Sequence, residues 1–413
     1  MTSVPPLSPA NHSSPAAPRN LPPRIRTDAS NAFAQNTMAV RVPAILDEVL
    51  ANNPDYAPGV RTRIVALRDA LRAGERLPPI DASAPHAALW VPELARRDGH
   101  GWQSSDWFCV ENYAYRCLAD AAEFWRDARD PFAPTKHAEY ASAAHRDALE
   151  AAVAIEGPSV PPGERLERLL LADVFANRMD LSFAASRDRG IRSESSDLLV
   201  DDRARAIEQL RGGNGAVHFI IDNAGTELTL DLVLAAHLIE QLSAPVVLHV
   251  KVHPAFVSDA IERDVRWFVQ GGDARAEALW GPSTAAAQSR RATLAAALDD
   301  GRLRIAPHPY WNGPASLWEL PEPLVRELSG ARLVLLKGDA HYRRAVGDAL
   351  WPPEASFAAV TAYFPAPLLA LRTLKSDTIV GLPAGMAARL DRDDARWRVN
   401  GQRAVASLGG TLR

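Results

Sequence analysis

The sequence predicts an α/β protein in which a helical N-terminal domain precedes an α/β/α domain built on a mainly parallel sheet. Its 413 residues exceed what one simple hydrophobic core normally holds, so two domains are expected. Residues 36–210 carry apolar side chains at helical spacing along most of their length. After a glycine cluster at 212–215, short apolar runs alternate with helix-length segments, which indicates parallel strands with helices on both faces.

The N-terminal half divides into a polar tail and a series of helices. Residues 1–30 are rich in Pro, Ser and Ala, a composition that cannot bury enough apolar surface to fold, so a disordered tail is expected, with a transit peptide as the alternative. We therefore expect a tail at 1–30, a helical domain at 31–211 and a catalytic domain at 212–413. The predicted helices of the first half span 42–50, 60–71, 106–125, 135–154, 165–175 and 201–210, with a loop at 177–190.

The second half is predicted to contain five principal strands. They span residues 217–221, 245–251, 303–306, 332–336 and 368–373. The predicted helices between them span 228–242, 258–270, 283–298 and 319–328. A last strand at 378–380 and a short helix at 384–391 are expected near the end of the chain.

Composition limits the classes of partner. A net charge of −4 provides no polybasic surface, so neither nucleic acid nor anionic membrane is an expected partner, and a small molecule is. No window has the 18 or more apolar residues that span a bilayer. Cys109 and Cys117 are eight residues apart on a predicted helix and cannot form a disulfide, which favours a reducing, cytoplasmic location. The sequence predicts no oligomeric state.

Polar side chains follow each of the five strands. Because parallel strands end at one edge of the sheet, these side chains are expected to meet there, where open α/β sheets bind ligands. The side chains concerned are Asp222, Asn223 and Glu227 after the first strand, Asp259 after the second, His308 after the third, Lys337, Asp339, His341, Tyr342 and Arg343 after the fourth, and Arg372, Thr373 and Lys375 after the fifth. Five strand ends of this kind indicate a site.

The residue types at these strand ends indicate the chemistry. Asp222, Asn223 and Asp259 offer the hard oxygen ligands that Mg²⁺ and Mn²⁺ prefer. Lys337, Arg343 and Lys375 offer cations for an anionic group such as phosphate. A metal beside such cations can orient a phosphoryl oxygen, neutralise charge and activate water. Metal-dependent hydrolysis of a phosphate ester is therefore expected.

Most of these residues also have a purely structural interpretation. An Asp-Asn pair before a helix often caps it, and the same holds for Asp259 after Ser258. Lys337-Gly338-Asp339 can form a turn, and His308 between prolines can be a structural histidine. On the 106–125 helix, a salt-bridged face and a substrate wall are both open for Glu111, Tyr115 and Arg116.

Several longer motifs resemble those of a known family. They are DNAGTEL (222–228), HVKVHPAFVSD (249–259), LLKGDAHYRRAVGD (335–348) and RTLKSD (372–377), with looser matches at WFCVENYAYR, DPF, NRMDLS, LLVDD and WRVNG. Over nearly the whole chain after residue 30, the sequence resembles the damage-control phosphatase family, and within it the acidic-residue methyltransferase-like branch.

The resemblance implies a Rossmann-like catalytic domain and a metal held by Asp222, Asn223 and Asp259. The metal would be Mn²⁺ or Mg²⁺, with Co²⁺ or Ni²⁺ also compatible, and the substrates sugar phosphates such as fructose 1-phosphate or fructose 6-phosphate. Substrate contacts would come from Glu227, Lys337, Lys375 and the 339–343 segment, including Asp339, His341, Tyr342 and Arg343. In that segment Ala340-His341 replaces an expected Leu-Asn pair. Because a histidine normally titrates near neutrality, this departure bears on the sugar preference.

Three other functions compete with hydrolysis by activated water. Asp222 itself can attack phosphorus to form an aspartyl-phosphate, as some phosphatases do. The branch name suggests an S-adenosylmethionine-dependent methyltransferase acting on glutamate side chains, but the DNAGTE corner holds only Gly225 and lacks a glycine-rich loop. A non-catalytic carbohydrate- or nucleotide-binding module would bind its ligand without turnover.

Overall fold

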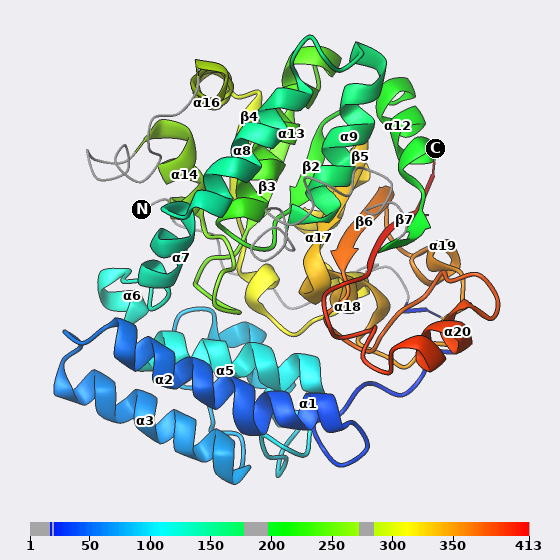
Figure 1. Ribbon diagram of the computed structural model, residues 1–413. Coiled ribbons are helices and arrows are strands. Elements are labelled where there is room, and N and C mark those ends of the chain that lie inside the picture. The colour runs from blue at the N-terminus through cyan, green and yellow to red at the C-terminus, as the bar shows by residue number, and fades with distance from the viewer. Residues whose placement is uncertain (1–16, 19, 177–196, 272–284, 413) are drawn as a thin grey trace.

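The computed structural model describes residues 17–18, 20–176, 197–271 and 285–412. A layer of N-terminal helices lies against one end of a larger α/β body (Figure 1). In α3, Val60, Ile64, Leu67 and Leu71 recur every three or four residues and are buried, which confirms the predicted helix. The layer consists of α1 (Ala32–Asn36), the π-helical turn η1 (Thr37–Arg41), α2 (Val42–Asn52), α3 (Pro58–Ala73), α4 (Val91–Ala95) and α5 (Trp107–Ala121).

The α/β body is built on one seven-stranded sheet with the order β1-β7-β6-β5-β2-β3-β4. All neighbouring strands pair in parallel except β6 and β7, which are antiparallel. The five principal strands predicted from the sequence form the continuous parallel part. The strands are β1 (Leu198–Asp201), β2 (Val217–Ile220), β3 (Val246–Val250), β4 (Leu303–Pro307), β5 (Leu333–Lys337), β6 (Pro367–Thr373) and β7 (Ala404–Gly410). The mainly parallel α/β fold is therefore confirmed.

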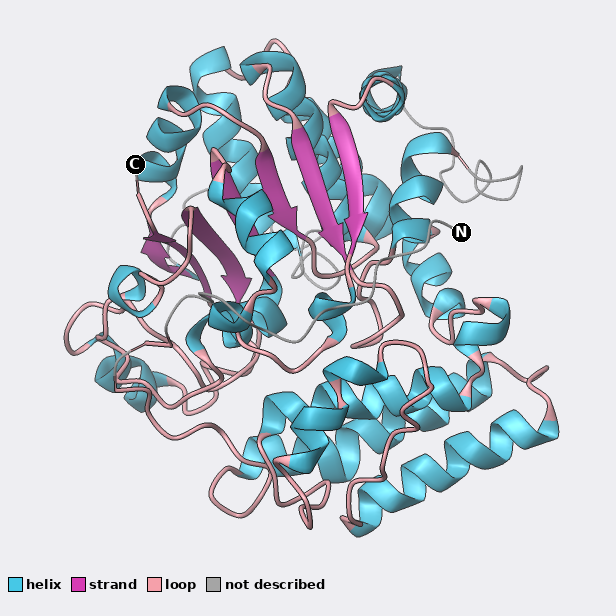
Figure 2. Ribbon diagram, turned by 180° about the vertical axis from the view of Figure 1, so that it is seen from behind, coloured by secondary structure: helices cyan, strands magenta, loops and turns pink. Residues whose placement is uncertain are grey.

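Helices cover both faces of the sheet, as Figure 2 shows from behind. Alternate residues of β2 serve different cores: Val217 and Phe219 pack with α13, whereas Ile220 packs with α17 and α18. One face carries α8 (Ala143–Ile155), α9 (Pro162–Val174), α12 (Arg203–Gly212), α13 (Thr226–Leu242), α14 (Glu262–Gln270) and α16 (Ala285–Asp299). The other face carries α17 (Glu322–Ser329), α18 (Gly338–Val346), α19 (Phe357–Val360) and α20 (Met386–Asp393).

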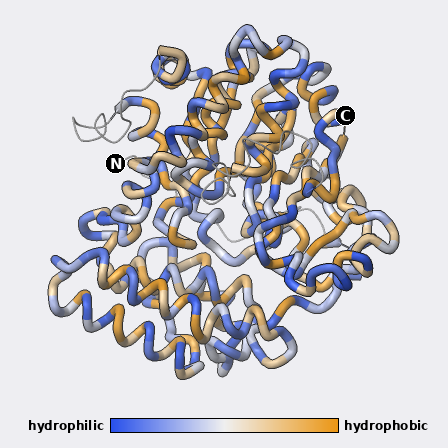
Figure 3. Tube along the Cα trace, viewed as in Figure 1, coloured by the Kyte–Doolittle hydropathy of each residue, from blue (hydrophilic) through white to orange (hydrophobic). Residues whose placement is uncertain are grey.

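Hydropathy follows these layers. In Figure 3 the hydrophobic colour gathers on the strands and helices inside the α/β body, while α2 and α3 alternate between the two extremes. Helix α13 is buried continuously from Thr226 to Ile239 because the sheet, α8, α9 and α16 surround it. No helix of the described residues is long and apolar enough to cross a membrane.

The structure corrects several predicted elements. The predicted strand at 378–380 is an irregular segment whose Thr378 carbonyl accepts a hydrogen bond from Arg372. Two strands were missed, β1 and β7, and β7 instead pairs with β6 along its whole length. The predicted helix at 106–125 is broken at Glu123, where φ is +59°, so that α6 (Phe124–Asp127) is separate. The predicted helix at 135–154 is likewise two helices, α7 (Ala133–Tyr140) and α8, because Ser142 caps a new start.

Part of the segment expected to be a disordered tail is packed against the body. Among residues 20–30, Ile25 and Thr27 are buried. Backbone hydrogen bonds join Ile25 to Asp348 and Thr27 to Ser105. Pairing with two separate parts of the chain satisfies backbone groups that composition alone assigns to solvent. Residues 1–16 and the predicted loop at 177–190 lie outside the described residues.

Candidate metal and phosphate site

The predicted corner after β2 lies where the strand order of the sheet changes direction. β2 lies between β3 on one side and β5 on the other. Asp222 and Asn223 follow β2, and Gly338 follows β5 with φ of +77°. A side chain at Gly338 would overlap the Asp222 carboxylate, so these two strand ends are in close contact. This is the switch point at which open α/β sheets bind ligands.

The segment after β3 folds back onto this corner and places Asp259 beside Asn223. The two residues form an isolated antiparallel bridge. The Ala260 amide donates to the Asp222 carbonyl at 2.8 Å, and the Ala224 amide donates to the Ser258 carbonyl. Helix α14 consequently begins at Glu262 instead of the predicted residue 258. The three residues predicted to bind metal thus line one pocket.

The carboxylates of this pocket repel one another. Asp222 is buried, and its Oδ1 accepts no hydrogen bond from the described residues. Burial, followed by the charges of Asp259 and Glu227, raises the pKa of Asp222 well above its usual range. Burial also raises the pKa of Asp259, although an ion pair with Lys251 opposes the effect. The arrangement is electrostatically costly without a further cation.

Asn223 is oriented by its neighbours. Its Nδ2 donates to Glu227 Oε2 at 2.8 Å and to Asp222 Oδ2 at 3.2 Å. Its Oδ1 accepts from the Ser258 hydroxyl at 2.7 Å. With the amide nitrogen engaged by two acids, Oδ1 is the Asn223 atom that can contribute to a metal ion.

Capping does not explain the Asp222-Asn223 pair. The first turn of α13 is capped by Glu139 of α7, whose Oε1 accepts from the Thr226 amide at 2.7 Å. Gly225 precedes that turn with φ of +72°, and a side chain there would overlap Glu139. Among the described residues, no backbone amide of α13 donates to Asp222 or Asn223. Gly225 therefore leaves the space that the Glu139 carboxylate needs to cap α13.

Lys337 lies in a buried cluster of charges that includes Glu227 of the pocket lining. Its Nζ is 2.7 Å from Asp173 Oδ1, 3.2 Å from Asp231 Oδ1 and 3.8 Å from Glu227 Oε1. It is not among the residues that line the pocket. Burial and the Asp173 charge raise the pKa of Asp231 well above its usual range, although Lys337 opposes the shift. In the structure Lys337 therefore neutralises buried acids and contacts Glu227 without lining the pocket.

Some side chains of the segment after β5 line the pocket, and others are buried in the core. Asp339, Ala340 and Arg343 line the pocket. His341 is buried with its Nε2 3.2 Å from the Ile221 carbonyl oxygen, and burial followed by the Lys251 charge holds its pKa well below its usual range. The expectation that His341 titrates near neutrality is therefore wrong. Tyr342 is also buried, and its hydroxyl donates to the Val380 carbonyl.

Ion pairs fix the two pocket-lining charges of α18. Asp339 accepts from Arg372 at 2.7 Å and from the Lys375 amide at 3.1 Å. Arg343 donates to Glu111 at 2.7 Å and pairs with Asp348. Lys375 lines the same pocket. His308, by contrast, accepts from the Tyr310 amide through Nδ1, which agrees with its structural interpretation.

The opposite wall of the pocket comes from the N-terminal helices. Thr37 and Arg41 belong to the π-helical turn η1, and Glu48 follows on α2. π-Turns are frequent at functional sites. Glu111 and Tyr115 of α5 complete this wall, whereas Arg116 is stacked on Trp125 elsewhere. Sequence reasoning missed Arg41 and Glu48, and the π-helical turn has no sequence signature that could have shown them.

Comparison with known proteins relates the chain to one family. Residues 37–390 match the model of the damage-control phosphatase ARMT1-like domain. The chain is similar to damage-control phosphatase ARMT1 of Danio rerio, with 28% identity over 95% of this chain and 98% of the relative. The Homo sapiens protein of that name is 26% identical over 77% of this chain and 78% of its own. A DUF89 family protein from Pyrococcus horikoshii, of solved structure, has a TM-score of 0.49 and 13% identity, covering 91% of this chain and 98% of its own.

The mainly parallel sheet with helices on both faces makes the fold Rossmann-like, and carboxylates and cations line one pocket at the carboxyl edge of its strands. The chain belongs to the damage-control phosphatase ARMT1-like family. It is accordingly a phosphatase, a hydrolase of phosphate esters, in a family of metal-dependent enzymes.

Proposed function

We propose that the protein hydrolyses phosphate monoesters of small metabolites at the pocket formed by Asp222, Asn223 and Asp259, with a divalent metal bound by these three residues. Sugar phosphates such as fructose 1-phosphate or fructose 6-phosphate are the proposed substrates. The pocket has a volume of about 440 Å³, which suits a molecule of that size.

The charge of the pocket is the observation that carries the proposal. Among the described residues its lining contributes six carboxylates, from Glu48, Glu111, Asp222, Glu227, Asp259 and Asp339, and three cations, from Arg41, Arg343 and Lys375. Lys251 and Arg372, which lie outside the lining, offset Asp259 and Asp339, whereas no ion pair among the described residues offsets Asp222, so a phosphate beside Asp222 would be repelled unless a further cation binds there. The partnerless Oδ1 of Asp222 and the raised pKa values of Asp222 and Asp259 support a metal at that point.

The oxygen-only ligand set suits Mn²⁺ or Mg²⁺ and also accommodates Co²⁺ or Ni²⁺. When bound, such an ion would neutralise a phosphoryl oxygen and lower the barrier to attack by water. Lys375 would hold the phosphate, and Glu227 would accept a substrate hydroxyl while it orients Asn223. Of the two residues that depart from the family motif, Ala340 faces the pocket and His341 does not. Ala340 is therefore the one that bears on the sugar preference.

A phosphatase screen against sugar phosphates tests this proposal, with Mg²⁺, Mn²⁺, Co²⁺ or Ni²⁺ added to the purified, metal-stripped protein. We expect activity only with metal, its loss on EDTA treatment, and a fall of at least a hundredfold in Asp222→Ala and Asp259→Ala. Asp300→Asn, at an exposed acid beside Arg302, is the matched control and should keep full activity. Activity that survives EDTA or both alanine variants would refute the metal site.

Rapid-quench kinetics separates the two hydrolytic routes, because direct attack by Asp222 predicts a burst of phosphoenzyme and attack by water predicts none. Methyl transfer is not favoured. The single glycine of the corner, Gly225, is required by the Glu139 cap instead of by the close approach of a nucleotide-like cofactor. A cytoplasmic location stays a prediction.

A further inference from the structure

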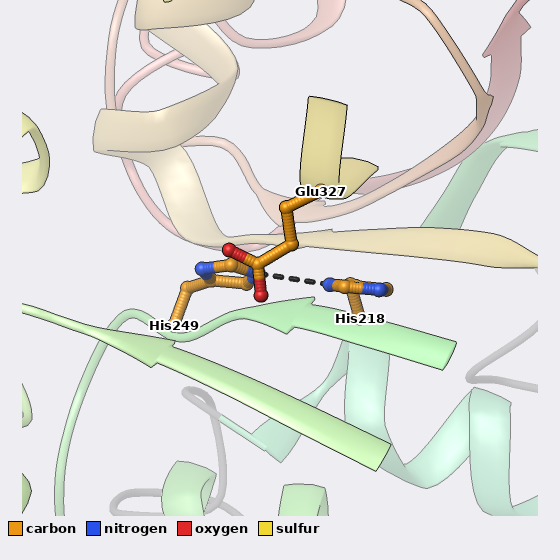
Figure 4. Close-up of side chains that lie close together, drawn as sticks. All are labelled: His218, His249 and Glu327. Carbon is orange, nitrogen blue, oxygen red and sulfur yellow. Dashed lines mark hydrogen bonds between the residues drawn. The ribbon is translucent and has the colours of Figure 1, made fainter. Parts of the chain in front are cut away.

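Two histidines and a glutamate meet on the sheet face opposite α13. His218 of β2 and His249 of β3 are buried, and His218 Nδ1 lies 2.9 Å from His249 Nε2. Glu327 of α17 points its carboxylate toward both rings (Figure 4). One potential ligand atom from each residue lies within 4.8 Å of the others, and these three form the His/Cys/Asp/Glu group of the described residues with metal-ligand spacing.

This cluster is separate from the phosphatase pocket. None of the three residues lines that pocket. His218 precedes Asp222 by four positions, which corresponds to roughly 13 Å along an extended chain. The donor sets also differ, because the pocket offers oxygen atoms while this cluster offers two imidazole nitrogens and one carboxylate. Imidazole suits zinc, copper and nickel ions better than magnesium or manganese.

The hydrogen bonding of the histidine pair is incomplete. Two neutral imidazoles that face each other share one proton between the facing nitrogens, so one donates and the other accepts. His249 Nδ1 is buried and has no hydrogen-bond partner among the described residues. The orphan Nδ1 is not the nitrogen that faces His218, so a metal ion held between the two rings would replace their hydrogen bond and would leave Nδ1 as it is.

The surroundings keep both rings in the form that binds metals. Burial and the charge of Arg304 lower the pKa of His218 to about 4. Burial, His218 and Arg304 hold the pKa of His249 well below its usual range. Neutral imidazole is the ligand state. Arg304 also pairs with Glu327, so the carboxylate is held at the edge of the pair.

We propose that His218, His249 and Glu327 form a second metal site, which binds a transition-metal ion of the zinc class. A tetrahedral ion with bonds of about 2.0–2.1 Å requires ligand nitrogens roughly 3.3 Å apart, so the two nitrogens separate by about 0.4 Å, their hydrogen bond breaks, and both rings turn until their lone pairs point at the ion. Glu327 moves inward from Arg304, and because its side chain is 27% exposed, water can take the fourth position. The ion links α17 to β2 and β3 and stabilises the fold.

Cobalt and zinc titrations of the full-length protein test this site. The double variant Asp222→Asn/Asp259→Asn provides the background, because it removes the ligands of the phosphatase pocket. In that background we expect one Zn²⁺ per chain by elemental analysis after dialysis, and visible absorption of tetrahedral Co²⁺. Glu327→Gln should weaken Zn²⁺ binding at least tenfold and reduce the increase in melting temperature that Zn²⁺ produces.

Glu322→Gln is the matched control, since Glu322 is exposed on the same helix and pairs with Arg326. It should bind Zn²⁺ as the background does. His249→Asn adds an independent test, because loss of a nitrogen ligand should remove the tetrahedral cobalt spectrum. The proposal is overturned if the background binds no Zn²⁺, or if Glu327→Gln binds it as tightly as Glu322→Gln. Neither outcome depends on phosphatase activity.

Discussion

Lys136 donates a hydrogen bond from Nζ to the backbone carbonyl of Asp259 at 2.8 Å, from a position between the buried carboxylate of Asp130 and the partly buried carboxylate of Asp264. The same Nζ contacts Asp130 at 2.9 Å and Asp264 at 2.8 Å. Lys136 belongs to α7, Asp264 to α14, and Asp259 to the loop that holds the proposed metal ligands. One lysine therefore ties an N-terminal helix to the backbone of the site.

Lys136→Met should destabilise the protein and loosen the site together. Removing the cation leaves Asp130 and Asp264 without their shared partner, a change that typically costs about 3–5 kcal/mol in a buried pair. Denaturant unfolding measures the stability, and calorimetric Mn²⁺ titration measures the affinity, which should fall because Asp259 loses its backbone anchor. Arg263→Met is the control: Arg263 donates to the Ala128 carbonyl across the same interface but is exposed. Equal effects of the two variants would contradict this role.

Gly338→Ala should impair the site more than the fold. The backbone at Gly338 has φ of +77°, which costs an L-residue about 1–2 kcal/mol. In addition the new methyl group would overlap the Asp222 carboxylate and displace it. Gly301→Ala separates the two effects, because Gly301 has φ of +82° and open space around it. We expect similar stability losses but a large fall in kcat/KM for Gly338→Ala alone, measured with the best substrate of the screen.

Lys337→Met should act on stability, and Lys375→Met on substrate binding. Lys337 neutralises the buried Asp173 and Asp231, so its removal is expected to cost about 3–5 kcal/mol in the free energy of unfolding. Lys375 lines the pocket, and its loss should raise KM with little change in stability. Denaturant curves and steady-state kinetics of both variants check this. A raised KM with unchanged stability in Lys337→Met would contradict this prediction and would indicate that Lys337 binds phosphate.

Lys337 lies at the end of its strand, as the sequence predicts, but it does not line the pocket. The parallel strands were predictable because they are short apolar runs buried on both faces, and their ends do meet at one edge. Side chains alternate across a strand, however, so Lys337 shares the α13 face with Leu333 and Leu335, whereas the Asp222 position shares the opposite face with Ile220. The two-residue period alone would still not have excluded Lys337, because Leu371 of β6 also lies on the α13 face and lines the pocket.

Other features had no usable signal in the sequence. β7 consists largely of small residues, AVASLGG, and forms through pairing with β6, a contact distant in sequence. Arg41 and Glu48 lie on helical segments where a charge facing a pocket looks the same as one facing solvent. Glu139 as the cap of α13 is equally non-local, since it precedes Thr226 by 87 positions. The local sequence pattern predicts the helices and strands. How they pack against one another decides the roles of residues such as Arg41, Glu48 and Glu139.

Acid should destabilise the protein through its buried histidines, and His145 illustrates the effect. Its Nε2 lies 2.9 Å from the Thr229 hydroxyl, and burial lowers its pKa to about 4 although the Tyr140 backbone opposes the shift. The unfolded chain takes up this proton near pH 6.5, while the folded protein does so only near pH 4. The unfolded state therefore binds more protons in this window, and stability present above pH 6.5 is lost as the pH falls toward 4.

His145→Gln should flatten that dependence. The glutamine amide can keep a hydrogen bond to Thr229 but cannot titrate, so the variant should lose up to about 1.4 kcal/mol less per pH unit than the parent. Urea unfolding at pH 7, 6 and 5 measures the slope. His137→Gln is the control, because His137 is exposed on α7 and stacks on Trp267. If His145→Gln and His137→Gln show the same slope as the parent, burial of His145 does not contribute to the acid sensitivity.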